Sequence, residues 1–147
     1  MTLAMRECPG ACVAFWSGTP TVRDCDDSVR AAKRAFAANN KAPLALVGVM
    51  MPDASMPCDV VRRRLAAQCA ELVPLASSIQ YVCLRPDFVG ATLMSIAASY
   101  YMKLTRSFKV GTTRDLSVAI EAIRVAGGPS LAVEKLIVDH IAAGEVP

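Results

Sequence analysis

The sequence predicts one α/β domain over residues 1–147, with a mainly parallel sheet of four strands in the order β-α-β-α-β-α-β-α and a further C-terminal helix. Two patterns predict this fold. Short apolar runs alternate with longer segments that carry an apolar stripe at helical spacing, and turn residues separate the two. The length of 147 residues fits one domain, and a composition of 54% hydrophobic and 20% charged residues excludes a disordered chain.

The first strand and helix are predicted near the N-terminus. Residues 11–17 form a short apolar run between turn residues, which predicts a strand, and Trp16 is expected to pack at an edge of the sheet. Thr19 followed by Pro20 is typical of a helix start, with the threonine as the cap. The apolar stripe of this helix consists of Val22, Cys25, Val29, Ala32 and Phe36.

The second and third strands are also apolar runs. Residues 44–51 are continuously apolar, as expected for a strand covered on both faces, and Pro52 ends the run. A helix is predicted to begin near Asp59, with its apolar stripe at Val61, Leu65, Cys69 and Leu72. Residues 79–84 predict the third strand.

The C-terminal third predicts one more strand and three helices. An uncharged helix is predicted over residues 88–104 and a short fourth strand over residues 108–111. Thr112 or Thr113 is expected to cap the following helix. A Gly-Gly-Pro sequence then stops that helix, and residues 130–143 are predicted to form a C-terminal helical extension.

The predicted helix 88–104 is apolar on more sides than a sheet can cover. A helix of this kind needs a second covering surface, which is either the last helix, over residues 131–142, or a second copy of the chain. Small side chains on it would allow a partner to approach closely. The residues predicted to bind a partner are Ala91, Met94, Ser95, Ala98, Tyr101 and Met102.

No catalytic motif stands out. The sequence contains no glycine-rich phosphate loop, no nucleotide fingerprint and no nucleophile elbow. The loops after the first three strands are where a parallel sheet holds a ligand, and their prolines suit a phosphate cradle poorly. Four polar residues in these loops form a candidate ligand or phosphorylation site, namely Asp53, Ser55, Arg85 and Asp87.

Cysteines and histidine predict neither a metal nor a cofactor. Six cysteines without a secretion signal indicate reduced thiols, and only Cys8 and Cys12 are close in sequence, so no zinc site is expected. His140 is interpreted as an ordinary histidine near a helix end. We therefore expect no catalytic residue, no metal and no cofactor.

Charge and hydropathy indicate a cytoplasmic protein. The net charge of +3 with only 5% aromatic residues is not typical of a nucleic-acid-binding domain. Arg62-Arg63-Arg64 is interpreted as a solvated helix face. The uncharged stretch 88–102 is shorter than the ~20 residues that cross a bilayer. No secretory signal is recognised at the N-terminus.

Residues 8–125 resemble the SpoIIAA-like or STAS domains of the anti-anti-sigma-factor type. The resemblance is carried by Phe-Trp-Ser-Gly-Thr-Pro-Thr at 15–21, Leu-Ala-Leu-Val-Gly-Val at 44–49, and Phe-Lys-Val at 108–110 before a Thr-capped helix. It implies a non-enzymatic module that acts through protein partners, of a kind in which some members are themselves switched by serine phosphorylation. The loop 53–57, Asp-Ala-Ser-Met-Pro, lacks the glycine and the second hydroxyl of the Asp-Ser-Ser/Thr-Gly signature.

The sequence therefore favours a regulatory or scaffold module that self-associates through helix 88–104 and catalyses nothing. The alternative is a small-molecule binding protein or an enzyme, with its site at the loops after the first three strands.

Overall fold

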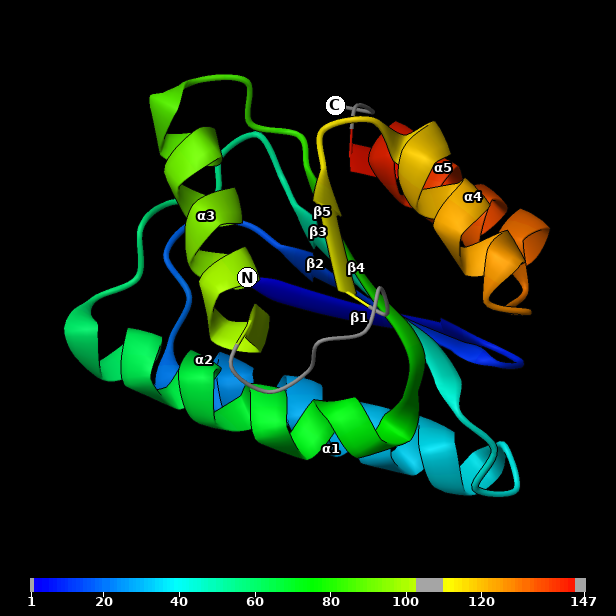
Figure 1. Ribbon diagram of the computed structural model, residues 1–147. Helices are drawn as coiled ribbons and strands as arrows, with labels where there is room; N and C mark the ends of the chain where they lie inside the picture. Colours follow the sequence, from blue (N-terminus) through cyan, green and yellow to red (C-terminus); the bar gives the residue numbers. More distant parts are fainter. Residues whose placement is uncertain (1, 103–109, 145–147) are drawn as a thin grey trace.

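The computed structural model describes residues 2–102 and 110–144, and these residues form a five-stranded sheet between two layers of helices (Figure 1). The strand order is β1-β2-β3-β4-β5, which is also the order along the chain. β1 is antiparallel to β2, and the remaining neighbours are parallel. The strands are β1 (Leu3–Cys8), β2 (Ala11–Trp16), β3 (Leu44–Met50), β4 (Ala76–Cys83) and β5 (Val110–Thr113).

Helices cover both faces of the sheet. Three of them lie on one face and follow β2, β3 and β4 in turn, while the other two follow β5 and lie on the opposite face (Figure 1). The first group comprises α1 (Val22–Ala38), α2 (Asp59–Leu72) and α3 (Phe88–Met102). The second group comprises α4 (Leu116–Val125) and α5 (Ser130–Gly144). The predicted α/β class and the mainly parallel sheet are confirmed.

The predicted number of four strands is wrong, because β1 adds a fifth. Pro9 and Gly10 form the turn of a hairpin in which Cys8 lies opposite Ala11, and Gly10 has a φ of +86° that favours glycine. β1 is an edge strand with exposed Arg6 and Glu7, so it lacks the continuous apolar run that marks the central strands.

Three predicted boundaries also need correction. The cap of α1 is Thr21, whose hydroxyl accepts from the backbone of Asp24 while the Asp24 carboxylate accepts from the backbone of Thr21. The cap of α4 is Asp115, because Thr112 and Thr113 belong to β5. β4 begins at Ala76, three residues earlier than the predicted strand. Residues 108–109 of the predicted fourth strand lie outside the described residues.

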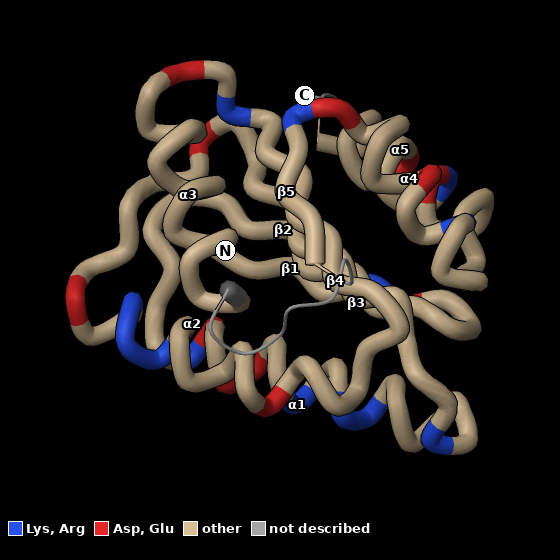
Figure 2. The backbone as a smooth tube through the Cα atoms, viewed as in Figure 1, with Lys and Arg blue, Asp and Glu red and all other residues tan. Residues whose placement is uncertain are grey.

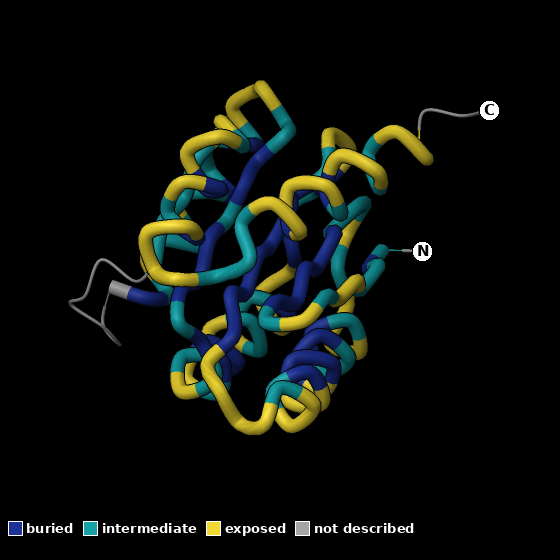
Figure 3. Tube along the Cα trace, turned by 90° about the vertical axis from the view of Figure 1, so that its right-hand side faces the viewer, coloured by how far each residue is buried: buried dark blue, intermediate teal, exposed yellow. Residues whose placement is uncertain are grey.

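Alternate strand residues face the two helical layers. Cys12, Leu46 and Ile79 pack against α1, α2 and α3, whereas Val13 and Val47 pack against α4 and α5. Buried residues accordingly follow the strands and the inner faces of the helices, and exposed residues lie on the outer turns (Figure 3). The core is therefore divided by the sheet into two parts.

The arrangement of the two helical layers shows whether α5 covers α3. α5 packs on β1, β2 and α4, on the face of the sheet opposite to α3. The last helix therefore does not cover the uncharged helix, which was one of the two alternatives. Across residues 2–102 and 110–144, no helix combines the length and the apolarity that crossing a membrane requires.

Candidate functional site

A pocket with a volume of about 80 Å³ lies between α2, α3 and the sheet, where the parallel strands reach their carboxyl ends. Trp16 at the end of β2 and Met50 at the end of β3 form its sheet side. Loops that follow strand ends are the usual place for ligands in parallel α/β sheets. The pocket lies at the loops where the sequence predicted a candidate ligand site, and of the four residues predicted there only Ser55 lines it.

The walls of the pocket are apolar. Leu65 of α2 faces Leu93 and Ile96 of α3 across it, and Tyr100 of α3 adds an aromatic side chain. None of the described residues that line it carries a charge. Such walls suit an uncharged ligand, because moving an ion from water into apolar surroundings is strongly unfavourable.

Gln68 is the amide in these walls, which also include the hydroxyl-bearing side chains of Ser55, Tyr81 and Tyr100. Its side chain is on the buried face of α2, and the residue is only 4% exposed. The hydroxyl of Ser28 donates to its Oε1 at 3.4 Å and also to the carbonyl oxygen of Cys25 at 2.8 Å. Within the described part of the chain, the structure gives the Gln68 Nε2 no hydrogen-bond partner. Ser78 Oγ is the only fully buried side-chain nitrogen or oxygen without a partner in the described residues, so the Gln68 Nε2 is not sealed from the space that its residue lines.

A pair of tyrosines stands next to Gln68. The hydroxyls of Tyr81 in β4 and Tyr101 in α3 are 3.0 Å apart. Tyr81 lies opposite Gly48 of β3, where the missing side chain leaves space for its ring. Burial raises the pKa of both tyrosines, so both hydroxyls are neutral at physiological pH.

A second cavity of about 40 Å³ adjoins the pocket. Trp16, Gln68 and Tyr81 line both cavities, so these three side chains separate them. Beyond them the second cavity extends under α1, between Ser28 and Leu46. The Gln68 amide therefore stands between two spaces that no described atom fills.

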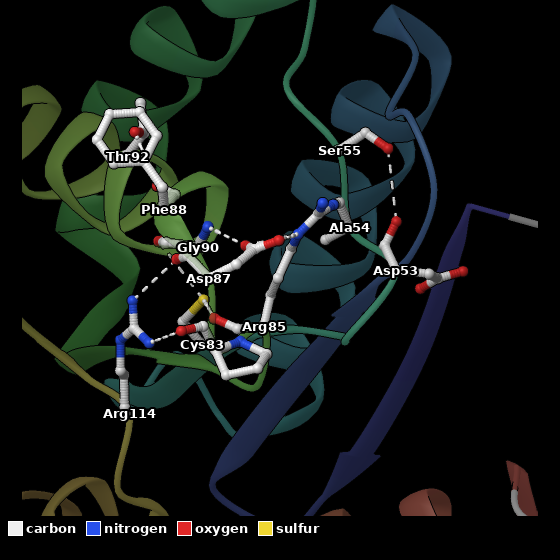
Figure 4. A network of polar contacts seen from close by, with 11 residues as sticks. Asp53, Ala54, Ser55, Cys83, Arg85, Asp87, Phe88, Gly90, Thr92 and Arg114 are labelled. Carbon is white, nitrogen blue, oxygen red and sulfur yellow. Dashed lines mark hydrogen bonds and ion pairs between the residues drawn. The ribbon is translucent and has the colours of Figure 1, made fainter.

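Polar contacts tie together the loops that form the rim of the pocket (Figure 4). Arg85 donates from Nε to both carboxylate oxygens of Asp87, at 2.9 and 3.1 Å, and from Nη1 to the carbonyl oxygen of Ala54. Asp87 also accepts from the backbone of Gly90 at 3.1 Å. The hydrogen bond from Arg85 and then that from Gly90 lower the pKa of the Asp87 carboxyl, although the group is exposed.

The four polar residues predicted as a ligand or phosphorylation site do not converge on one point. Arg85 and Asp87 form an ion pair, and Ser55 lies at the rim, where its hydroxyl donates to the carbonyl oxygen of Asp53 at 3.4 Å. The carboxylate of Asp53 points away from Arg85 (Figure 4). Asp53 instead lines a separate depression on the other face of the sheet, together with His140.

The six residues predicted to bind a partner fall into three groups. Ser95 is exposed on the outer side of α3, and Ala91, Met94 and Ala98 are half-buried. Tyr101 is only 2% exposed, because its hydroxyl pairs with Tyr81 inside the protein, so it does not belong to an outer surface. The side chain of Met102 lies outside the described residues.

The cysteines contribute mainly to packing. Cys12, Cys25, Cys69 and Cys83 are buried, Cys8 is half-buried and Cys58 is exposed. Burial raises the pKa of the Cys12, Cys25 and Cys69 thiols to about 11. Residues 2–102 and 110–144 contain no group of three histidine, cysteine, aspartate or glutamate side chains placed to hold a metal ion.

His140 is part of the packing between α5 and the sheet. Its ring stacks on Phe15 of β2, with ring centroids 3.7 Å apart and an interplanar angle of 17°. Burial, and then the charge of Arg6, lower the pKa of the His140 imidazole. The residue is thus a stacking partner, which the interpretation as an ordinary helix-end histidine did not predict.

Sequence reasoning missed the residues that make the pocket. Trp16 was expected at a sheet edge, but β2 is an inner strand and Trp16 lines the pocket. Gln68 lies three residues after Leu65 and four before Leu72, so it is a polar residue on the apolar stripe of α2. That interruption of the stripe was the available signal.

Comparison of the chain with models of protein families, with curated proteins and with solved structures gives no match.

Proposed function

We propose that this chain is a non-enzymatic binding module of the STAS-like type, which pairs with a second copy of itself through the outer face of α3. The observation that carries the proposal is that α3 has no charged residue over its 15 residues. Its first residue, Phe88, is a large apolar side chain that is 84% exposed. Exposed apolar surfaces of this kind are typical of interaction sites.

The neighbouring helices on the same face of the sheet differ from α3. Between α1 and α2, Arg64 pairs with Asp26 at 2.6 Å and with Glu71 at 3.0 Å. Lys33 also pairs with Glu71, at 3.6 Å. Charged residues are accordingly distributed along α1 and α2, whereas α3 has none (Figure 2). The contrast distinguishes α3 from the other two helices on this face of the sheet.

A second copy can dock on α3 without bringing charged side chains together at the contact. Two chains with a net charge of +3 each repel one another, and an uncharged helix is a place where they can meet without bringing like charges together. Ala91, Ser95 and Ala98 follow one another at helical spacing with short side chains, which allows two helices to approach closely. A symmetric dimer uses such a self-complementary stripe on both chains.

The ionisable groups near the pocket support binding rather than catalysis. Arg85 and Asp87 are engaged with each other and with loop backbone, in an arrangement that holds the loops in place. The resemblance of residues 8–125 to STAS domains supports the same class of function, a module that acts through protein contacts.

Sedimentation velocity over a range of micromolar concentrations tests the proposal. The native chain is expected to dimerise, and Ser95→Lys is expected to weaken the dimer at least ~100-fold, because it brings two like charges together at the symmetric contact. Val138→Lys is the matched control, since it adds the same charge on an exposed apolar position of α5. A native chain that stays monomeric at the highest concentration contradicts the proposal, as does an equal effect of both variants.

A second candidate function is the binding of a small molecule. The pocket between α2 and α3 is the specific observation that favours it.

A further inference from the structure

We propose that the pocket between α2, α3 and the sheet binds a neutral, mostly apolar small molecule that carries one oxygen acceptor, such as a hydroxyl or a carbonyl. This inference does not depend on the dimer, because the pocket is formed within one chain.

The size of the pocket sets the size of the ligand. A cavity needs roughly 10–15 Å³ to hold one water molecule, and an engineered cavity of about 150 Å³ binds benzene. The volume of about 80 Å³ lies between these values, and the second cavity of about 40 Å³ adjoins it. A single six-membered ring therefore enters the pocket only in part, and its remainder lies at the open rim.

The Gln68 amide determines which kind of polar group the ligand carries. Its Nε2 is a hydrogen-bond donor without a partner in the described structure, in a residue that is 4% exposed and lines both cavities. An oxygen acceptor on the ligand would satisfy this donor, while the rest of the ligand contacts Leu93, Ile96 and Trp16. A mainly apolar pocket with a small number of placed polar groups is typical of small-molecule sites.

The charge of the surroundings excludes ions as ligands. No described residue lining the pocket is charged, and the nearby guanidinium of Arg85 already binds Asp87 and the carbonyl oxygen of Ala54. An anion in the pocket would lose its hydration without gaining a cation.

The rim of the pocket is open to solvent, and a backbone hydrogen bond holds its two loops together. Gly18, Pro20 and Ser55 line the pocket and are partly exposed, so a ligand can reach it from solvent. The backbone of Ser55 donates to the carbonyl oxygen of Gly18 at 2.8 Å, which joins the loop after β2 to the loop after β3. A preformed rim lowers the ordering cost of binding.

Trp16 provides a local readout. It is the only tryptophan of the chain and it lines the pocket, so its fluorescence reports on occupancy. The probes are cyclohexanol, methylcyclohexane and cyclohexanecarboxylate, which share one ring and differ in the polar group. Cyclohexanol is expected to bind about five-fold more tightly than methylcyclohexane, the gain of one hydrogen bond. The carboxylate is expected to bind at least ~10-fold more weakly than cyclohexanol.

Two variants separate the hydrogen bond from the cavity. Gln68→Leu is expected to abolish the preference for cyclohexanol over methylcyclohexane while binding of the hydrocarbon remains. Ser28 keeps its bond to the carbonyl oxygen of Cys25, so this change leaves no new unpaired hydroxyl. Ala97→Phe places a ring in the pocket and is expected to abolish binding of all three probes. Val118→Phe adds the same ring at an exposed position of α4, on the opposite face of the sheet, and is expected to leave binding unchanged.

Each outcome decides the proposal. A Trp16 response that does not saturate, or that persists in Ala97→Phe, overturns it, as does an unchanged alcohol preference in Gln68→Leu. Circular dichroism checks that each variant folds, and Ala97→Leu replaces Ala97→Phe where the larger side chain prevents folding. Titrations at concentrations where the chain is monomeric separate the two proposals. Probe binding there supports the pocket whether or not the chain dimerises, whereas silent probes together with a dimer that Ala97→Phe disrupts would make the pocket a contact for the second copy.

Discussion

At the level of single residues, Gly48 makes room for the tyrosine pair beside the pocket. The ring of Tyr81 lies over the backbone of Gly48 on the neighbouring strand, and its hydroxyl reaches Tyr101 of α3. A side chain at position 48 would compete with that ring for the same space. The glycine therefore allows β4 and α3 to be joined by a hydrogen bond inside the core.

Gly48→Ala is expected to destabilise the protein by about 1–3 kcal/mol, as overpacking of a core does. The added Cβ would lie 2.6 Å from a ring carbon of Tyr81, so the ring must shift and its contact with Tyr101 weakens. Equilibrium unfolding in urea measures the change. Gly144→Ala is the control, because a Cβ there meets nothing within 4 Å. A Gly48→Ala variant as stable as the native chain would show that the ring is free to move aside.

Gln68 shows how far single residues could be interpreted from the sequence. Its place on the apolar stripe of α2 was visible, and so was its polar character. Its function was not, because Ser28 comes from α1 and the two cavities are bounded by Trp16 and Tyr81 from separate strands. A pattern along one helix contains no information about which distant residues leave a space beside it.

At the level of elements, Arg85 links two loops that are remote in sequence. It is held by Asp87 in the loop between β4 and α3, and it donates to the carbonyl oxygen of Ala54 in the loop between β3 and α2. Arg114, after β5, donates to the carbonyl oxygens of Pro86 at 2.7 Å and of Asp87 at 3.2 Å. Three strand ends are thus connected by two arginines.

Arg85→Met is expected to loosen the rim of the pocket and to destabilise the protein by about 1.5–3 kcal/mol, the range for a lost hydrogen bond to a charged group. Hydrogen exchange is expected to quicken at the amides of Ala54 and Ser55, and the pKa of Asp87 is expected to rise towards its ordinary value. Arg30→Met is the control, because its exposed pair with Asp27 contributes little. Unchanged exchange at Ala54 and Ser55 would refute the role of Arg85 as a link.

The sequence predicted central elements better than edge elements. β3 reads as a continuous apolar run because helices cover both of its faces, and its predicted range differs from the observed one by one residue. β1 was missed because one side of an edge strand is open to water, which removes the apolar signal. The true cap of α1 is Thr21 rather than Thr19, because the choice depends on the side chain of Asp24.

At the level of the whole molecule, α5 closes the second face of the sheet through an aromatic contact. His140 stacks on Phe15, while Val133 and Ile137 of the same helix are buried in the core formed with β2 and β3. A neutral imidazole is favoured in this position, because burial and the charge of Arg6 lower its pKa. Stability is therefore linked to the protonation of His140.

The contribution of His140 to stability is expected to be complete above about pH 6.5, the ordinary pKa of histidine, and to be lost as the pH falls through the lower pKa of the folded state. His140→Phe keeps a stacked ring that cannot be protonated, so the variant is expected to gain stability relative to the native chain as the pH falls below 6.5. Thermal unfolding of both chains over this range measures the difference.

Carboxylates that lose stability in acid are present in both chains, so the comparison isolates the histidine. Lys135→Met serves as a control on the exposed side of α5, where Lys135 pairs with Asp139 at 2.8 Å. A difference between the native chain and His140→Phe that does not vary with pH would show that His140 titrates alike in the folded and unfolded states.

The order of the strands has a consequence for the synthesis of the chain. Each strand pairs with the one that precedes it in the sequence, so the sheet can grow by addition at one open border as translation proceeds. No late strand has to be inserted between two that are already paired, as happens in sheets whose order reverses. The hairpin of β1 and β2 closes over only two residues and supplies a local starting template. Each strand is thus synthesised directly after the strand with which it pairs.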